Sequence, residues 1–233
     1  HKNLRDNIEK THGFSNWLGS SDTETFINLI ELEGIENALK MSLGMFSFAV
    51  YDRKFNQLHL ARDRMGEKPL YFFLNPKCLL FGSELKALMQ FKVFEKKISM
   101  TSLATYFRLN YIPTPYSIFE NTFKCPQGQY ISFDLDQFKV TNTVSDFDTL
   151  ASAAGVSVKK YWDLEEFIGH NKYQENDLDI ATSNLEDILS RAVQRQLISD
   201  VPLGAFLSGG IDSSLIVALM QKASSKKIKT CIL

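Results

Sequence analysis

Residues 201–214 read VPLGAFLSGGIDSS, and this stretch indicates how the C-terminal part of the chain folds. Its first seven residues are mostly apolar and predict a short buried strand that ends at Leu207. Two glycines then predict a turn, and we expect a helix to begin near Asp212. The preceding segment has apolar residues on one helical face, namely Leu185, Ile188, Leu189, Ala192, Val193 and Leu197. This order of helix, strand, loop and helix predicts the start of a parallel α/β sheet over residues 177–233.

The loop between this strand and helix has the composition of an anion site. Backbone N–H groups of the glycine turn and a helix N-terminus meet at one point, which is an arrangement that binds phosphate. The hydroxyls of Ser208, Ser213 and Ser214 can add donors. Asp212 would repel phosphate unless Mg²⁺ bridges its carboxylate to the phosphate oxygens. The acid therefore indicates a metal-bound nucleotide, with Asp212 as the metal ligand.

Other motifs with a similar appearance do not fit the loop. The patterns GxxxxGK[ST], GxGxxG and GxSxG cannot be laid over its residues. The structural alternative is an ordinary glycine-rich turn before a helix capped by serine. Such a turn needs neither the three serines nor the acid at this spacing.

The segment from residue 1 to residue 135 has the pattern of an α+β domain. SDTETFINLIELEG (21–34) predicts a capped helix that ends at Gly34. Three segments alternate with period two and each predicts a hairpin: 44–63, 69–84 with its turn at Asn75-Pro76, and 122–135 with its turn around Pro126 and Gly128. Residues 83–91 and 99–111 have helical spacing, the second with Ser99 as its N-cap. We expect antiparallel sheets covered by helices.

Residues 136–176 are polar and lack sustained periodicity, so we expect a linker between two domains. Within this linker only KYWDL stands out, because Trp162 could anchor the chain against a neighbouring surface. The predicted domains are therefore residues 1–135 and residues 177–233.

Composition limits the classes of function. The chain has 233 residues, of which 44% are hydrophobic, and this is enough for one large or two small cores. Its 26 Lys and Arg residues balance 27 Asp and Glu residues, so no basic field favours nucleic acid or an anionic membrane surface. No apolar run reaches the ~18 residues that a membrane span needs. Three scattered cysteines suit free thiols in the cytoplasm.

Several segments resemble, in one order, the asparagine synthetase B family of the glutamine-hydrolysing type. They are SDTE, GMFSFAVYD, LARDRMGEKPLYF, FGSELKAL, KYWDL and VPLGAFLSGGIDSS. The resemblance covers nearly the whole chain. It implies the later part of an Ntn-hydrolase-type class II glutamine amidotransferase domain, built as a sandwich of antiparallel sheets and helices. The beginning of an ATP-pyrophosphatase domain with a parallel α/β sheet would follow.

The resemblance also implies a reaction and its site residues. MgATP would adenylate a carboxylate, with aspartate as the default acceptor, and ammonia released from glutamine would attack the adenylate. The backbone of Leu207 would touch the nucleotide. The pyrophosphate would lie against Ser208, Gly209, Gly210, Asp212 and Ser213. Asp22 of SDTE would bind the α-amino group of glutamine, although an ordinary helix N-cap also explains an acid at this position.

The sequence departs from the family pattern at the glutaminase nucleophile, which in the family is an N-terminal Cys. Position 1 is His, and Cys78, Cys125 and Cys231 have no free amine beside them. We therefore expect an inactive fragment of a longer enzyme, with no catalytic residue of its own, and a homodimer is possible for the full-length protein. One alternative is a related amidotransferase or carboxylate-activating synthetase with a sugar, peptide or β-lactam precursor as acceptor. Another is a non-enzymatic remnant or binding module.

Overall fold

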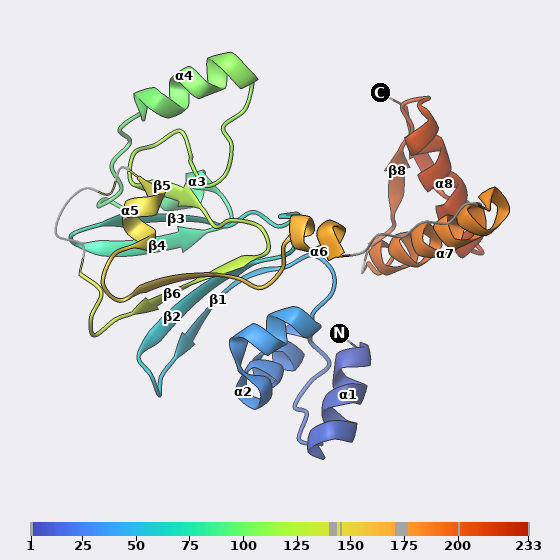
Figure 1. Ribbon diagram of the computed structural model, residues 1–233, viewed down its shortest axis with the longest axis horizontal. Helices are drawn as coiled ribbons and strands as arrows, with labels where there is room; N and C mark the ends of the chain where they lie inside the picture. Colours follow the sequence, from blue (N-terminus) through green and yellow to red (C-terminus); the bar gives the residue numbers. More distant parts are fainter. Residues whose placement is uncertain (1, 140–143, 145, 171–176, 200, 233) are drawn as a thin grey trace. The chain divides into compact units, whose positions relative to one another are not determined.

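The computed structural model describes residues 2–139, 144, 146–170, 177–199 and 201–232. The chain divides into two compact units, His1–Glu165 and Glu166–Leu233 (Figure 1). The first unit contains two antiparallel sheets, and the second contains a small parallel sheet with two long helices. The predicted α+β domain followed by a parallel α/β domain is confirmed at this level.

The larger sheet has four antiparallel strands in the order β1-β2-β6-β7. They span Ser47–Asp52, Gln57–Arg62, Gln129–Asp134 and Val156–Lys160. Leu60 of β2 lies opposite Ala49 on one side and Ile131 on the other. Because side chains alternate between the two faces of a strand, Leu60 enters one hydrophobic core while Ala61 enters another on the opposite face. The predicted β1–β2 hairpin is confirmed.

The smaller sheet has three antiparallel strands in the order β4-β3-β5. They span Cys78–Gly82, Tyr71–Asn75 and Thr122–Lys124. The predicted β3–β4 hairpin is confirmed. At its turn the side-chain oxygen of Asn75 accepts hydrogen bonds from the N–H groups of Lys77 and Cys78 at 2.9 and 3.0 Å. An Asn side chain that bonds to the backbone in this way stabilises a tight turn.

The third predicted hairpin is wrong, because β5 and β6 belong to different sheets. β5 pairs with β3, whereas β6 lies between β2 and β7. The side chains explain this arrangement, since Phe123 of β5 and Phe133 of β6 enter the same core from opposite sheets and both contact Phe72. The turn around Pro126 and Gly128 therefore carries the chain from one sheet to the other.

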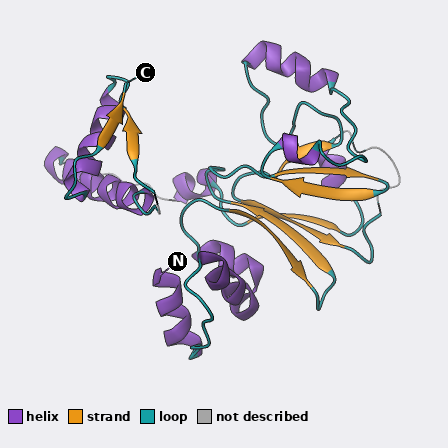
Figure 2. Ribbon diagram, turned by 180° about the vertical axis from the view of Figure 1, so that it is seen from behind, coloured by secondary structure: helices purple, strands orange, loops and turns teal. Residues whose placement is uncertain are grey.

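The two sheets of the first unit stack face to face, as the orange strands in Figure 2 show. Their shared core contains Leu60, Leu70, Phe72, Leu74, Phe123, Cys125, Ile131, Phe133, Phe147 and Leu150. On the outer face of the larger sheet, Leu39 of helix α2 (Asp22–Met41) packs with Ala61 and Tyr130. On the outer face of the smaller sheet, Leu88 of helix α3 (Leu85–Leu88) packs with Phe73. The predicted sandwich of sheets and helices is confirmed.

The first unit has two further helices, α1 and α4. Helix α1 (Lys2–His12) packs on α2 through Ile8, which contacts Leu29 and Ala38 in a small core of its own. Helix α4 (Met100–Leu109) begins at the predicted N-cap, where the hydroxyl of Ser99 accepts a hydrogen bond from Ser102 N–H at 3.2 Å.

Helix α2 leaves helical geometry at Gly34, where φ is 76° and ψ is 161°, and then resumes up to Met41. The predicted end at Gly34 is thus a break inside a longer element. Only glycine adopts these angles without a large penalty. The break separates the first part of the helix, which carries Asp22, from the last part, which carries the buried Leu39.

The predicted linker over residues 136–176 contains regular structure of the first unit. Helix α5 (Phe147–Ala151) places Phe147 and Leu150 in the core between the sheets, and β7 pairs with β6 along five residues. The structure therefore differs from the linker prediction. The sequence pattern did not reveal β7 because a short edge strand with two exposed lysines shows little apolar alternation. Helix α6 (Leu164–His170) follows. Residues 140–143, 145 and 171–176 of this segment lie outside the described residues.

The second unit contains helix α7 (Leu178–Gln196), strand β8 (Gly204–Phe206), helix α8 (Ile211–Ala223) and strand β9 (Lys229–Cys231). β8 and β9 pair in parallel, as the sequence predicts. Val193 of α7 packs with Leu219 and Met220 of α8. Leu185 and Ile188, which share the predicted apolar face of α7, are more than half exposed.

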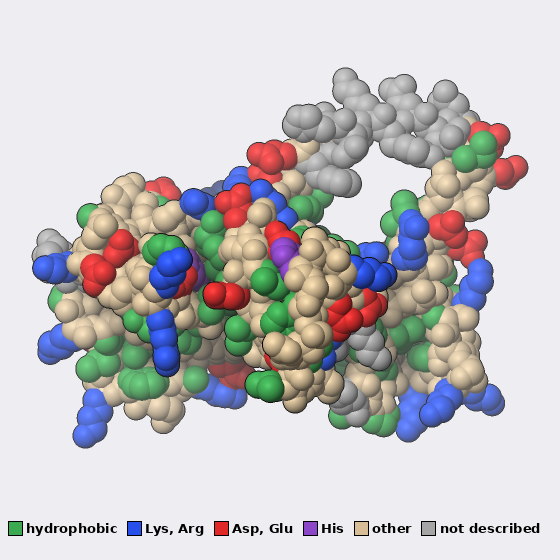
Figure 3. All heavy atoms as spheres, turned by 90° about the horizontal axis from the view of Figure 1, so that it is seen from below, with side chains coloured by type: hydrophobic (Ala, Val, Ile, Leu, Met, Phe, Trp, Pro, Cys, Tyr) green, Lys and Arg blue, Asp and Glu red, His purple; other side chains and the backbone are tan. Residues whose placement is uncertain are grey.

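The charged side chains follow the balanced composition. On the face shown in Figure 3, Lys and Arg side chains lie among Asp and Glu side chains, with hydrophobic side chains between them. Within the described part of the chain, no helix combines the length and apolar character that crossing a membrane requires.

Candidate functional site

The residues predicted to bind ATP lie in the loop between β8 and α8 and in the first turn of α8. β8 ends at Phe206 and α8 begins at Ile211, so the predicted boundaries are correct within one residue. Leu207 continues the strand, because its N–H donates to the carbonyl oxygen of Cys231 at 2.9 Å. The loop turns at Gly209, where φ is 82°, a left-handed conformation that favours glycine.

The start of α8 differs from the starts of four other helices. Helices α2, α4, α5 and α7 have an N-cap side chain that accepts a first-turn N–H, from Ser21, Ser99, Asp146 and Asp177 respectively. The N-cap of α8 is Gly210, which has no side chain to accept such a bond. The first-turn N–H groups of α8 are therefore available to an external acceptor, and the positive end of the helix dipole favours an anion there.

Serine hydroxyls surround this helix start. The hydroxyls of Ser208 and Ser213 lie 3.1 Å apart, and those of Ser213 and Ser214 donate to the carbonyl oxygen of Gly210 at 3.1 and 2.8 Å. Ser208, which precedes the turn, and Ser213, which is in the first turn of the helix, thus meet above Gly210. The arrangement can offer hydroxyl and backbone donors to one group of phosphate oxygens.

Asp212 lies exposed in the first turn of α8. Among the described residues, no three His, Cys, Asp or Glu side chains gather as a metal site would require, so a site made of protein ligands alone is not present there. Mg²⁺ is commonly held by one or two carboxylates together with phosphate oxygens and water. A single exposed carboxylate beside an anion site fits that mode of binding.

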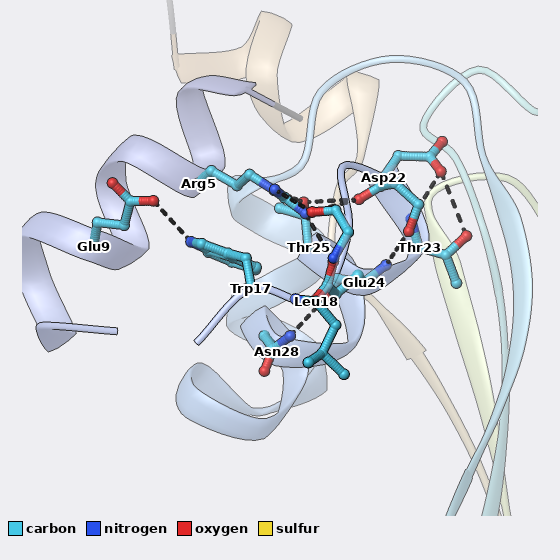
Figure 4. Close-up of polar contacts among 11 residues, drawn as sticks. Arg5, Glu9, Trp17, Leu18, Asp22, Thr23, Glu24, Thr25 and Asn28 are labelled. Carbon is cyan, nitrogen blue, oxygen red and sulfur yellow. Dashed lines mark hydrogen bonds and ion pairs between the residues drawn. The ribbon is translucent and has the colours of Figure 1, made fainter. Parts of the chain in front are cut away.

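Asp22 lies at the first position of α2, and its side chain is exposed (Figure 4). The N-cap is Ser21, whose hydroxyl accepts a hydrogen bond from Glu24 N–H at 3.1 Å. Ser21, and not Asp22, is therefore the N-cap of α2. One carboxylate oxygen of Asp22 accepts from the N–H of Thr23 at 2.7 Å. The other oxygen can accept from a ligand.

A shallow cavity of about 220 Å³ lies next to Asp22, between the first part of α2 and strand β1. Phe26, Phe46 and Phe48 form its apolar wall, with ring centroids 4.9 to 6.0 Å apart. Asp22 and Thr23 also line the cavity. A carboxylate beside an apolar wall suits a ligand that has an ammonium group and a short aliphatic stem.

The cysteines show no sign of nucleophilic activation. Burial raises the pKa of Cys125 to about 12, and burial also raises the pKa of Cys78. Thiols with raised pKa values carry little thiolate at neutral pH. Cys231 is exposed on β9.

The charged segment from Arg62 to Lys68 is held by hydrogen bonds between its charged side chains and the backbone. Asp63 is 1% exposed, and its carboxylate accepts four backbone N–H groups, from Phe46, Met65, Glu67 and Lys68, at 2.9 to 3.3 Å. The guanidinium group of Arg62 donates to three backbone carbonyl groups. Both charged groups therefore stabilise the backbone conformation of this segment, which is a structural role.

Sequence reasoning missed two residues near Asp22, namely Arg5 of α1 and Glu24 of α2. They form an ion pair of 3.0 Å beneath the loop that leads to Asp22 (Figure 4). One sequence signal was present, because Ser21 and Glu24 have the S-x-x-E spacing of a capping box. No comparable signal links Arg5 to a loop so far along the chain.

Comparison with known families matches both units of the chain. The family model of the glutamine amidotransferase domain matches residues 1–144, and that of asparagine synthase matches residues 184–233. A putative asparagine synthetase [glutamine-hydrolyzing] 2 of Methanocaldococcus jannaschii is 34% identical over 87% of the chain and 35% of its own length. Asparagine synthetase [glutamine-hydrolyzing] 3 of Bacillus subtilis is 32% identical over 86% of the chain and 29% of its own length.

The chain thus spans about a third of the length of these curated relatives. A solved glutamine phosphoribosylpyrophosphate amidotransferase from B. subtilis covers 99% of the chain, with a TM-score of 0.41 and 14% identity. A similarity of this size carries no argument about function. The two family models, in contrast, agree with the relatives and with the order of the two units. The chain therefore belongs to the glutamine amidotransferase domain family, and its C-terminal segment is similar to asparagine synthase.

Proposed function

We propose that this chain is part of a cytoplasmic glutamine-dependent amide ligase that uses MgATP to activate aspartate and ammonia from glutamine to form the amide. Family membership supports the reaction class. The observation that carries the proposal is the start of α8, where a glycine N-cap and a cluster of serine hydroxyls lie at the end of a parallel strand. Ligands of parallel α/β sheets bind outside the carboxyl ends of the strands.

The loop would bind the pyrophosphate portion of ATP. In this role, first-turn N–H groups of α8 and the hydroxyls of Ser208 and Ser213 would contact the phosphate oxygens, and Gly209 would allow the chain to turn close to them. The backbone donors are fixed by the helix, so they can stabilise negative charge on the leaving pyrophosphate without rearrangement. The hydroxyls of Ser208 and Ser213 would first turn away from each other and from the carbonyl oxygen of Gly210. Asp212 would hold Mg²⁺, and the ion would neutralise phosphate charge when bound.

The backbone of Leu207 would contact the nucleotide. Its N–H already donates to Cys231, so the contact would involve its carbonyl oxygen or the apolar surface of the residue. The sequence alone suggests a contact through any backbone atom of Leu207, whereas the structure leaves its N–H group out of that contact.

In the first unit, Asp22 would bind the α-ammonium group of glutamine. The exposed carboxylate lies at the edge of the small cavity, and the aromatic wall would contact the aliphatic stem of the substrate. The carboxylate of Asp22 has one oxygen engaged by Thr23, which fixes its orientation toward a ligand. Glutamine, aspartate and ATP are then the three small-molecule substrates of the whole enzyme.

Titration of the chain with MgATP and with magnesium pyrophosphate tests the nucleotide site. We expect Asp212→Asn and Ser213→Ala each to weaken binding about tenfold, the effect of losing one charge-assisted contact. Asp187→Asn, an exposed acid on α7, is the matched control and should bind as the wild type does. Equal affinities for all four proteins would contradict the proposal.

A further inference from the structure

Arg5 lies in helix α1 and reaches across to the loop that precedes Asp22 (Figure 4). Its side chain is 16% exposed. The guanidinium group donates to the hydroxyl of Thr25 at 2.9 Å, to the carbonyl oxygen of Gly19 at 2.8 Å and to that of Ser21 at 3.4 Å. It also pairs with Glu24 at 3.0 Å. One planar fork therefore contacts both the loop and the first turn of α2.

Glu24 holds the same loop from the helix side. Its carboxylate oxygens accept the backbone N–H groups of Leu18 at 2.6 Å and Gly19 at 3.0 Å. The bond from Leu18 is the largest cause of a lowered pKa for Glu24, and the bond from Gly19 and the charge of Arg5 also lower it. Glu24 is thus an ionised acceptor at the centre of the loop, and charge-assisted bonds of this kind are stronger than neutral ones.

The position of Arg5 is itself fixed by packing. Its guanidinium carbon lies 4.2 Å from the centre of the Trp17 ring, within the range of a cation–π contact. The indole N–H of Trp17 donates to Glu9 of α1 at 2.7 Å. The guanidinium fork therefore has little freedom to move away from the loop.

These contacts fix the backbone on both sides of Asp22. On one side Arg5 bonds the carbonyl group of Ser21, and on the other side Glu24 and Thr25 are bonded through their side chains. A carboxylate that must meet an ammonium group needs its backbone held within a fraction of an ångström.

We propose that Arg5, through its pair with Glu24, is a positioning residue for Asp22 in the glutamine site. The inference rests on the proposed binding of glutamine by Asp22. Arg5 does not touch the substrate in this scheme. It sets the geometry of the carboxylate that does, and so determines how well the first unit selects a ligand with a free α-ammonium group.

The test is a glutamine titration followed by amide NMR of Asp22 and Thr23, with hydrogen exchange of the Leu18 and Gly19 amides as a second readout. Arg5→Met removes the fork and keeps the aliphatic stem. We expect it to weaken glutamine binding about fivefold and to speed exchange of the two loop amides about tenfold. Exchange of the Leu60 amide in the core should not change, which shows that the fold is intact.

Three further variants separate the possible results. Arg5→Lys keeps the charge but lacks the fork, so it should restore only part of the affinity. Lys10→Met, an exposed cation on the same helix, should behave as the wild type. If Asp22→Asn loses glutamine binding while Arg5→Met keeps it, the positioning role is overturned and the glutamine site stands. If the wild type does not bind glutamine, or if Asp22→Asn binds it as well as the wild type, the glutamine site and this inference fail together.

Discussion

The carbonyl oxygen of Trp162 lies 2.6 Å from the position that a Cβ atom would take on Gly128. Gly128 also has a φ of 65°, in the left-handed region. Gly128→Ala must therefore strain the backbone at position 128. It must also shift the backbone at Trp162, because the clashing oxygen belongs to a main-chain carbonyl group. We expect it to lower the free energy of unfolding of the first unit by about 3 kcal/mol, measured by urea denaturation.

The matched control is Gly13→Ala. Gly13 has a similar φ of 63°, but a Cβ atom there meets nothing within 4 Å. Only the backbone strain remains, and the expected loss is about 1 kcal/mol. Equal losses for the two variants would show that the close approach of Trp162 is not a constraint.

Asp63→Ala should destabilise the first unit by about 3 kcal/mol, because it leaves four backbone N–H groups without their acceptor. Thermal unfolding measures the effect. Asp6→Ala, an exposed acid on α1, should change stability by less than about 0.5 kcal/mol. A small effect at Asp63 would mean that water replaces the carboxylate at these N–H groups.

Phe133→Ala should cost about 3 to 5 kcal/mol, since the side chain is fully buried between the two sheets and the cavity left behind is lined by other aromatic rings. Phe55→Ala removes a side chain that is 59% exposed near the β1–β2 turn and should cost less than about 1 kcal/mol. Chemical denaturation of both variants gives the comparison. The prediction fails if the two losses are similar.

The stability that Glu24 contributes to the first unit should be lost in acid. In the unfolded chain its carboxyl group has its ordinary pKa of 4.5, and folding lowers this pKa, chiefly through the hydrogen bond from Leu18. The ionised carboxylate thus contributes stability that is complete above about pH 4.5 and is lost as the pH falls through the folded pKa. Unfolding of the wild type and of Glu24→Gln at about pH 6 and about pH 3 should show a stability difference that shrinks in acid. A difference that does not depend on pH would contradict this role.

Local sequence patterns predict the structure correctly where residues that are neighbours in sequence are also neighbours in space. The β1–β2 and β3–β4 hairpins follow from alternation and turn residues, and the start of α4 follows from Ser99. The loop after β8 is one short segment, so its geometry could also be anticipated, including the glycine turn. That ATP binds there stays a proposal.

Features that depend on distant contacts could not be predicted in this way. Phe123 and Phe133 are both apolar, and nothing local says that they belong to different sheets. β7 carries lysines because it is an edge strand, so it looked like part of a linker. The contact of Arg5 with Glu24 joins residues 19 positions apart in the sequence and became visible only in the folded chain.

The pairing of β7 with β6 has a practical consequence for dividing the protein into pieces. The match to the amidotransferase family ends at residue 144, yet β7, Phe147 and Leu150 all lie beyond that point. Truncating the protein at residue 144 would remove β7 and leave the N–H and C=O groups on one side of β6 unpaired. An exposed strand of this kind promotes pairing with other chains and aggregation. An expression clone that stops after Glu165 should yield a monodisperse product, whereas one that stops at residue 144 should precipitate.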